Sequence, residues 1–507
     1  MREIDVTHID REINRLAGMA SVNTLPALQA ALVRSRSRLC APMQLAILGK
    51  ISSSKSTLVN AILGKNELMA TGQKEVTWNV GWIKYGKPTD DITIYHKDGS
   101  EPRKCPRSKF EEIITGYYGK GTDNISYIEI HDDAEILRDI NIIDTPGLDA
   151  LRGKDSQNTL DFISEVRPDA VMMLFTHNVA DNVLEVVRQF NAESSFNPFN
   201  ALGIMAKIDV RWQESFPKVQ SAIEIGEKFA KSRLKKDPTL RMSLFNLYPV
   251  SALLFLASST FSEDDLELMR QWRSRDSAGF VKSLATPATF LAANPDDASR
   301  KKLLDKIGLY GIWLVNRELE ANPEVSAEDI CEIFRRESGA ATLMGVVLNH
   351  FGSRATLIKL ESIYQDLMQA VNRDRAVYGQ MAVDSIARNI HQIFTPLVLS
   401  HLQLEVLYGI YSGDIDPEEN TEEIKALCGE KGTSAPLMLG MKPGSTCNEM
   451  YARIDERLKF WRASLSLEPD PEERQWMDVV VRSYSALKEN LRQAEYNFIS
   501  SKAFIEG

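Results

Sequence analysis

The chain has 507 residues, of which 43% are hydrophobic and 26% are charged. At roughly 150 residues per domain this length predicts two to four domains, and the composition excludes a collagen-like, low-complexity or largely disordered protein. The 60 Lys and Arg residues against 70 Asp and Glu residues give a net charge of -10. This excess of acid disfavours a generally basic nucleic-acid binder, so we expect no nucleic-acid partner.

Cysteine usage and hydropathy indicate the cellular compartment in which the protein is expected. The cysteines lie far apart, without a CxxC pair or a Cys/His cluster, so we expect neither a zinc site nor a disulfide framework. The compartment that this cysteine usage predicts is a reducing cytoplasm. The most apolar stretch, residues 396–411, is interrupted by polar side chains, so any membrane contact is expected to be peripheral. The cysteines are Cys40, Cys105, Cys331, Cys428 and Cys447.

Residues 1–42 have the apolar spacing of helices, with Ile9, Ile13 and Leu16 on one face and Leu25, Leu28 and Leu32 on the next. From residue 43 to residue 252, short apolar runs alternate with helical stretches. This alternation predicts an α/β fold with a mostly parallel sheet and helices on both faces. A turn at residues 97–99 predicts one antiparallel addition. The expected strands are 44–48, 77–85, 92–95, 126–130, 140–143, 170–175, 202–205 and 247–250.

From about residue 253 the strand pattern disappears and helical spacing dominates. Residues 357–371 and 480–498 carry apolar side chains at heptad-like spacing, which is typical of helices packed side by side. The acidic stretch 412–423 and the Gly- and Pro-rich stretch 429–447 predict a loop between these helices.

The strongest motif lies in residues 44–64, QLAILGKISSSKSTLVNAILG, an apolar run followed by a Ser-rich loop and a helical pattern. This order is typical of a P-loop, whose backbone N–H groups surround phosphates at a helix N-terminus. Lys55 would neutralise the β- and γ-phosphates and Ser56 would bind Mg²⁺. Ser54 stands where the consensus has glycine, although the chain is expected to turn helical there. The expected nucleotide contacts in this loop are Gly49, Ser52, Ser53, Ser54, Lys55, Ser56 and Thr57.

Taken alone, this segment also fits a plain serine-rich loop between a strand and a helix. A second motif, residues 140–148 (INIIDTPGL), makes that alternative less favourable. Asp144, at the end of an apolar run, is placed to hold Mg²⁺ through water. The Gly147 amide is placed to reach a γ-phosphate and so to sense its hydrolysis.

The third motif, residues 202–209 (LGIMAKID), places a carboxylate directly after a strand. Asp209 can accept hydrogen bonds from guanine N1–H and its exocyclic amine, while the stem of Lys207 covers the base. Adenine presents the opposite donor pattern, so this motif selects GTP over ATP. Between the first two motifs, Thr77 is expected to bind Mg²⁺ and position the attacking water, with Thr71 as the fallback; both also fit ordinary turn and strand residues.

With these motifs in place, the chain resembles the dynamin superfamily of large GTPases, most closely the bacterial dynamin-like proteins. GKISSSKSTLVNAILG is similar to that family's P-loop, INIIDTPGL to its second switch and MAKID to its guanine-specificity loop. The segment around Ser251 looks like the last base-contacting loop. Residues 337–359 resemble the end of the GTPase domain in small actinobacterial members of the isoniazid-inducible type. The motif resemblance covers about residues 44–360.

The resemblance implies a P-loop GTPase that binds GTP, GDP and Mg²⁺ and hydrolyses GTP without an arginine finger. It gives Ser52 the role of stabilising charge between the phosphates and Thr77 that of the first-switch threonine. Three positions depart from the family pattern: Ser54 replaces glycine, Ile51 replaces a water-orienting glutamine of eukaryotic members, and Ala206 replaces Asn or Thr. These departures predict slow turnover and micromolar nucleotide affinity.

The domain organisation that follows has three parts. Residues 1–42 supply N-terminal helices, residues 43–354 form the GTPase domain with a helical insertion at about 253–336, and residues 355–507 form the rest of a helical bundle. The resemblance implies GTPase heads that dimerise across the nucleotide, possible action beside a second dynamin-like protein, and a trunk that touches lipid. The expected compartment is the cytoplasm, with peripheral association at the inner face of the cell membrane.

The lipid contact is assigned to the loop 435–442, which carries Leu437, Met438, Leu439 and Met441 beside Lys442. The alternative for these side chains is packing under a neighbouring helix or at an oligomer contact. The basic stretch 228–236 is expected to be a solvated helix face. Two functions remain: a dynamin-like GTPase that binds or remodels membranes, and a slow nucleotide-gated switch that binds a protein partner.

Overall fold

The computed structural model describes residues 6–506 except 51–52, 66–67, 69–79, 90, 107–124, 146–167, 177–197, 216–220, 276, 294–297 and 395–396. The chain divides into two compact units. One, the head, comprises residues 44–194 and 201–344; the other, the helical unit, comprises residues 1–43, 195–200 and 345–507. Each unit is described by itself below.

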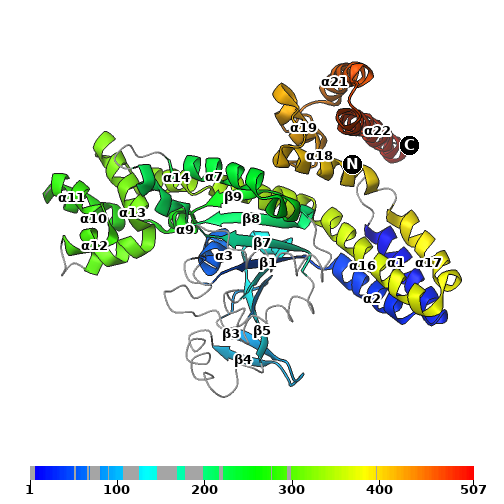
Figure 1. Cartoon of the computed structure of the whole chain (residues 1–507), viewed down its shortest axis with the longest axis horizontal. Helices are drawn as coiled ribbons and strands as arrows, with labels where there is room; N and C mark the ends of the chain where they lie inside the picture. The colour runs from blue at the N-terminus through cyan, green and yellow to red at the C-terminus, as the bar shows by residue number, and fades with distance from the viewer. Residues whose placement is uncertain are drawn as a thin grey trace. The chain divides into compact units, whose positions relative to one another are not determined.

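The head contains a nine-stranded sheet in the order β4-β3-β5-β2-β6-β1-β7-β8-β9 (Figure 1). Strands β1, β7, β8 and β9 run parallel, as the alternating pattern predicts. The strands are β1 (Met43–Gly49), β2 (Val80–Tyr85), β3 (Asp91–His96), β4 (Arg103–Pro106), β5 (Ile125–Asp132), β6 (Ile140–Asp144), β7 (Ala170–Phe175), β8 (Ala201–Ala206) and β9 (Leu247–Val250).

The other part of the sheet contains more antiparallel strand pairs than the single antiparallel addition that the sequence predicts. β2 is antiparallel to β6 and β3 is antiparallel to both β4 and β5. The β3–β4 hairpin forms at the predicted turn. Gly99 there has a φ of 72°, which residues with a side chain rarely adopt. β4 itself was not predicted, because its four residues RKCP carry one buried side chain, Cys105. Thr77, the predicted start of β2, lies outside the described residues.

Short polar residues cap several helices of the head. Asp237 and Ser251 accept hydrogen bonds from the backbone of the helices that follow them. The helices and 3₁₀ turns are α3 (Lys55–Leu63), η3 (Glu135–Arg138), η6 (Ile208–Ser215), α7 (Ala222–Lys236), α8 (Pro238–Ser243), α9 (Ala252–Thr260), α10 (Glu263–Arg275), α11 (Ser277–Ser283), α12 (Pro287–Ala292), α13 (Ala298–Ala321), α14 (Ala327–Glu337) and α15 (Ala340–Val346).

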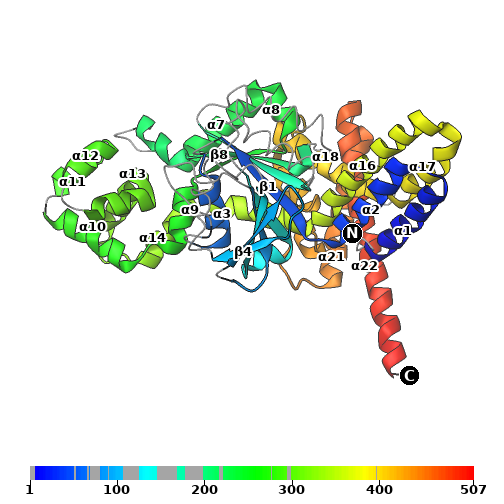
Figure 2. The same ribbon diagram turned by 90° about the horizontal axis from the view of Figure 1, so that it is seen from below.

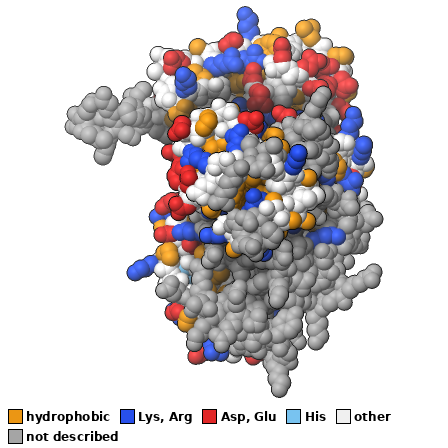
Figure 3. All heavy atoms as spheres, turned by 90° about the vertical axis from the view of Figure 1, so that its left-hand side faces the viewer, with side chains coloured by type: hydrophobic (Ala, Val, Ile, Leu, Met, Phe, Trp, Pro, Cys, Tyr) orange, Lys and Arg blue, Asp and Glu red, His pale blue; other side chains and the backbone are white. Residues whose placement is uncertain are grey.

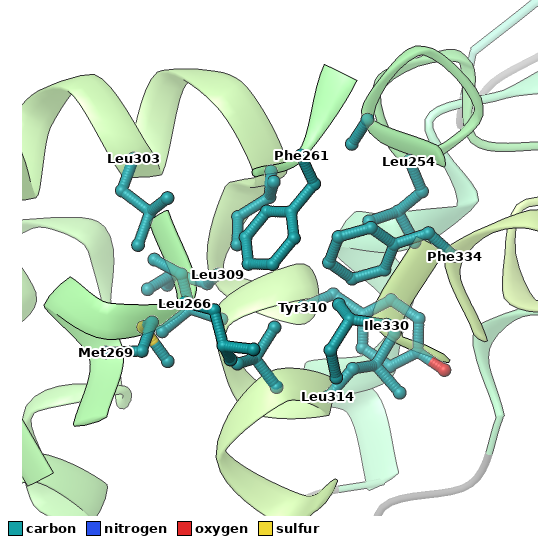
Figure 4. Packing of buried hydrophobic residues seen from close by; sticks show 14 of the residues in the cluster. Leu254, Phe261, Leu266, Met269, Leu303, Leu309, Tyr310, Leu314, Ile330 and Phe334 are labelled. Carbon is teal, nitrogen blue, oxygen red and sulfur yellow. The ribbon is translucent and has the colours of Figure 1, made fainter. Parts of the chain in front are cut away.

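The helices α10 to α14, here called the insertion, share one apolar core with α9 and η6. Phe261, Leu266, Tyr310 and Phe334 are each at most 6% exposed, and Figure 4 shows their side chains converging from different helices. This core excludes water from the contact of the insertion with α9 and η6. In the view of Figure 3, the described surface carries Lys and Arg side chains interspersed with Asp and Glu.

Four helices of the helical unit pack side by side in Figures 1 and 2: α1 (Val6–Val22), α2 (Pro26–Cys40), α16 (Ala355–Tyr378) and α17 (Gln380–Phe394). The apolar positions predicted from spacing, including Ile13, Leu28 and Leu367, form their core. No side chain of its own caps α2. Instead Asp374 of α16 accepts hydrogen bonds from the N–H groups of Ala27 (3.2 Å) and Leu28 (2.8 Å).

The rest of the helical unit comprises η5 (Pro198–Asn200), a π-helical turn η7 (Val347–Ser353), α18 (Val398–Ser412), η9 (Glu418–Asn420), α19 (Thr421–Leu427), α20 (Ala435–Met438), α21 (Cys447–Leu467) and α22 (Pro471–Glu506). The stretch 412–447 is therefore not a continuous loop. Two short helices interrupt it, and Met438 and Leu439 are only 3% and 5% exposed. These two side chains pack inside the protein and do not face lipid in this structure.

Among the described residues, no single helix has both the length and the apolar character needed to cross a bilayer. α17 and α18 have the required length and apolar character only when they are taken together, and a 66° bend separates the two helices. The apolar face of α17, with Val383, Ile386 and Ile390, belongs to the four-helix core.

Candidate functional site

The phosphate side of the site starts where β1 ends. The strand is buried along most of its length and reaches Gly49. A Cβ at Gly49 would lie 2.7 Å from Ser53 Oγ and 3.0 Å from the Leu174 carbonyl oxygen, so only glycine fits this close approach. Ser53 and Ser54 lead into α3. The N–H groups at the start of this nine-residue helix have no partners within it and favour an anion.

Ser54 has a left-handed backbone, with φ 70° and ψ 28°, directly before α3. The chain turns helical at the next residue, Lys55, but Ser54 itself lies outside the right-handed helical region. The left-handed region costs a residue with a Cβ about 1–2 kcal/mol, which explains in physical terms why a glycine suits this position. Ser54 is not a neutral replacement, and the loop holds a strained conformation where phosphates would be bound.

Lys55 begins α3 and turns its side chain back into the loop. Its Nζ donates hydrogen bonds to the carbonyl oxygens of Gly49 (3.1 Å) and Lys50 (2.9 Å), and the residue is only 6% exposed. The ammonium group is thus held inside the turn that surrounds the phosphate position. Thr57, also predicted as a nucleotide contact, is half-buried in the first turn of α3.

Asp144 ends β6 and is fully buried beside α3. Ser56 Oγ donates to its Oδ2 at 2.9 Å, whereas Oδ1 is buried and accepts no hydrogen bond from the described residues. Burial raises the pKa of Asp144 to about 6, although the charge of Lys55 and the Ser56 hydrogen bond oppose that rise. The Ser56 hydroxyl and the Asp144 carboxylate, one oxygen of which accepts no hydrogen bond from the described residues, are oxygen ligands of the kind that Mg²⁺ prefers.

Thr145 fixes this carboxylate relative to the P-loop strand. Its Oγ1 donates to the Ile47 carbonyl oxygen at 2.7 Å, and the residue is completely buried. The bond ties the residue directly after β6 to β1. Sequence reasoning treated Thr145 as part of the motif and gave it no role, because a side chain-to-backbone bond across strands leaves no pattern in one segment.

The base side of the site lies at the ends of β8 and β9, which are adjacent and parallel. Lys207 follows β8 with a left-handed φ of 58°, and Asp209 is the second residue of η6. Ser251 follows β9 and is completely buried. Its Oγ accepts from the Leu254 N–H at 3.2 Å, so its side chain caps α9.

Among the predicted site residues, direct contacts join Ser56 to Asp144 and Lys55 to the loop around Gly49. Ser53 is completely buried in the same loop. Lys207, Asp209 and Ser251 share the carboxyl edge of β8 and β9. Ser52, Thr77 and Gly147 lie outside the described residues, so their predicted roles remain predictions.

Known proteins match the chain across these motifs. Residues 45–207 match the model of the dynamin family. The isoniazid-induced protein IniC of Mycobacterium tuberculosis is 24% identical over 469 residues, which cover 90% of this chain and 91% of that protein. A probable transmembrane GTPase, the chloroplastic FZO-like protein of Arabidopsis thaliana, is 25% identical over a region that covers 47% of this chain and 22% of that protein.

A solved structure of an oligomerised bacterial dynamin pair, described as sensing and tethering membranes, covers 99% of this chain and 75% of its own. Its sequence identity is 16% and its TM-score is 0.32. At that TM-score the superposition adds nothing to what the motifs and the family match indicate.

Proposed function

Because this chain is a bacterial dynamin-like protein and a GTPase, we propose that it hydrolyses GTP with Mg²⁺ and couples hydrolysis to head dimerisation and membrane binding. The observation that carries the catalytic part is the Ser56–Asp144 pair, in which a fully buried carboxylate keeps one oxygen open next to the P-loop lysine. Such an arrangement weakens the fold and suits a cation that arrives with the nucleotide.

In this proposal the phosphates lie at the N-terminus of α3. Lys55 neutralises the β- and γ-phosphate oxygens, and the backbone of residues 50–54 donates to them. Ser56 and Thr77 would hold Mg²⁺, and Asp144 would hold it through water. When bound, Mg²⁺ neutralises charge that develops on the phosphates. Thr77 positions the attacking water and Ser52 stabilises charge between the phosphates.

The base is read at the other end of the site. Asp209 accepts from guanine N1–H and the 2-amine, and the aliphatic stem of Lys207 covers the ring. Ala206 ends β8 without a polar side chain, so the contact that an Asn or Thr would supply is missing. The Ser251 side chain is occupied as a helix cap, and the backbone of its loop supplies the remaining contact. We expect GTP and GDP affinities in the micromolar range.

For the membrane arm, a groove between α21 and α22 offers a basic surface. Lys459, Arg462, Lys488 and Arg492 line it together with Asp455 and Glu489. Lys488 pairs with Asp455 and Arg492 pairs with Glu489, so Lys459 and Arg462 are left without an acidic partner among the described residues. Each such cation is worth about 1 kcal/mol near an anionic lipid surface.

A second candidate function is a slow, GTP-gated switch that dimerises and binds a protein partner, such as a second dynamin-like chain, instead of lipid. Two observations favour it. Ser54 holds a strained backbone at the phosphate loop, which argues for slow turnover, and Met438 and Leu439 are buried rather than offered to a bilayer.

GTP turnover per molecule across a wide protein concentration range tests the first candidate. We expect turnover to rise with concentration, because a head-to-head dimer completes catalysis. Lys55→Ala is the blank, and Lys65→Ala is the control because Lys65 lies just after α3 and pairs with Asp133 at 3.0 Å. GTP binding with turnover flat and equal to the blank would leave only the switch.

Flotation with vesicles rich in anionic lipid separates the two functions. The membrane-binding protein is expected to float in the presence of GTP, and the Lys459→Glu, Arg462→Glu double variant to remain in the soluble fraction. The matched control is Lys425→Glu, which removes a cation that pairs with Glu422 on α19 outside the groove. A wild-type protein that never floats supports the switch.

A further inference from the structure

The helical insertion meets the base side of the site at a break in its longest helix. α13 is interrupted at Gly308, where φ is 64° and ψ is 175°. A Cβ at Gly308 would lie 3.3 Å from Leu253 Cδ2 and 3.9 Å from Asp209 Oδ2. The bare backbone of the break therefore passes next to the carboxylate that we assign to the guanine base.

Aromatic packing holds the segment that follows Asp209 against the same helix. Trp212, three residues after Asp209, is 1% exposed. Its ring lies 6.0 Å from that of Tyr310 and 5.8 Å from that of Trp313, and the Tyr310 and Trp313 rings are stacked at 6.0 Å. Ring pairs at these separations attract each other beyond the area they bury, so η6 is held rigidly on α13.

Tyr310 also links α13 to the end of the insertion and to the start of α7. Its hydroxyl donates to Glu337 Oε2 at 2.8 Å and accepts from the Ala222 N–H at 3.1 Å, while Ser221 Oγ donates to the same Glu337 oxygen at 2.7 Å. In Figure 4 the ring lies among the apolar residues and the hydroxyl lies at the edge of the cluster.

The second base-side loop is held by the residues that close the insertion. The Ser251 N–H donates to the Ser338 carbonyl oxygen at 2.9 Å. Gly339 has a φ of 75°, and a Cβ there would lie only 2.3 Å from the Pro249 carbonyl oxygen. Both loops that approach the base are thus supported from the insertion, at two separate points.

We propose that the insertion is the positioning element for base recognition, with Gly308, Trp212 and Trp313 fixing Asp209 in the orientation that reads the guanine 2-amine. This inference rests on the proposed function, since it takes Asp209 as the group that reads the base. Gly308 is the critical residue, because any side chain there both strains the break and presses on Leu253 beside Asp209.

The ratio of the dissociation constants for inosine diphosphate and GDP tests this role, because inosine lacks only the 2-amine. We expect the wild-type protein to prefer GDP by about tenfold or more, the worth of one hydrogen bond to a carboxylate. Gly308→Ala is expected to reduce the preference to about threefold or less. Gly99→Ala is the control, since Gly99 has a similar φ of 72° but open space around it.

General loss of folding weakens both nucleotides equally and leaves their ratio unchanged, so the ratio isolates positioning. If Gly308→Ala does not fold, Trp313→Leu, at a partly buried position, removes one stacking partner of Trp212 and is expected to lower the ratio several-fold. An unchanged ratio in the folded variant would overturn this inference alone, provided that Asp209→Ala abolishes the preference. A wild-type protein without any preference would overturn the assignment of Asp209, and this inference with it.

Discussion

Two carboxylates, the fully buried Asp144 in the head and the partly buried Glu423 in the helical unit, differ in how far their hydrogen-bonding needs are met. Asp144 in the head is fully buried and one of its oxygens is open. Glu423 in the helical unit accepts from Arg457 Nε (2.7 Å), Trp461 Nε1 (3.0 Å) and the Tyr484 hydroxyl (2.7 Å) on the same oxygen. Its other oxygen lies 2.7 Å from Arg457 Nη2.

The difference separates a group that the fold needs from a group that the fold tolerates. Glu423 joins α19 to α21 and α22, and burial together with this carboxylate raises the pKa of Tyr484 well above its usual range. Asp144 instead has its own pKa raised to about 6 by burial. Charged groups with a structural role are fully paired within the fold, whereas charged groups of a binding site keep hydrogen-bonding capacity for a ligand.

The largest expected effect comes from removing the cation beside Asp144. Lys55→Ala should lower GTP affinity by about 100-fold or more, because hydrogen bonds from a charged group to two phosphates are lost. It should also raise the pKa of Asp144 further, since the charge of Lys55 is the first influence that opposes its rise. Equilibrium binding of a fluorescent GTP analogue measures the loss, and near wild-type affinity would contradict the role given to Lys55.

Glu423→Gln should damage the fold and spare the nucleotide site. Losing the charge opposite Arg457 in a partly buried pair is expected to cost about 2–4 kcal/mol of unfolding free energy. Urea unfolding measures this cost. The neighbouring Glu422→Gln is a matched control, because Glu422 is 68% exposed and its pairs with Lys425 and Lys431 lie on the surface. Equal losses in the two variants would remove Glu423 from the structural side of the comparison.

Ser54→Gly tests the strain at the phosphate loop. Relieving the left-handed backbone should raise the unfolding free energy of the head by up to about 1 kcal/mol, partly offset by the greater freedom of glycine in the unfolded chain. It should also tighten GTP binding. Thr24→Gly, at a residue with a φ of 57° in the helical unit, should stabilise similarly and leave GTP binding unchanged. Looser GTP binding in Ser54→Gly would show that the serine serves the phosphates directly.

The smallest effect is expected at His401, which lies between two carboxylates of the helical unit. A hydrogen bond with Glu405 (3.3 Å) raises its pKa, and the charge of Glu361 (3.6 Å) adds to the rise. A raised histidine pKa stabilises the folded state below about pH 6.5, the unfolded value, and the benefit disappears as pH rises through the folded value.

His401→Gln should therefore be less stable than the wild type near pH 6 and equal to it at high pH. Urea unfolding of both proteins between pH 6 and 9 gives the difference at each pH. A difference that is constant over this range, or that grows with pH, would contradict the assigned pKa shift.

Sequence alone predicted the α/β head, the helical unit and the order of the nucleotide motifs, because strand, loop and helix signals of a P-loop are local. The apolar spacing of Ile13, Leu28 and Leu367 likewise marked a real helical core. What the pattern missed depends on backbone conformation or on distant partners. The open oxygen of Asp144 is one example, and the left-handed backbone of Ser54 is another, since a serine does not mark such a conformation as a glycine would.

The loop 435–442 shows the same limit from the other direction. Its apolar side chains in a Gly- and Pro-rich stretch indicated a lipid contact; Met438 and Leu439 are buried, whereas Leu437 and Met441 are half-buried. Short helices, α19 and α20, give these side chains neighbours that the sequence pattern did not predict. The support that the insertion gives to the base-side loops was missed for the same reason, because Gly308 is about 100 residues from Asp209.

Asp144→Asn is the most direct test, measured as unfolding free energy and Mg²⁺-dependent GTP binding on the same sample. The ionised carboxylate costs the fold about 3 kcal/mol near neutral pH, from a pKa raised to about 6 from 3.8. An amide of the same shape avoids that cost, so we predict a head that is more stable by about 1–2 kcal/mol and that loses Mg²⁺-dependent GTP binding. A variant that is less stable and still binds GTP with Mg²⁺ would contradict the account.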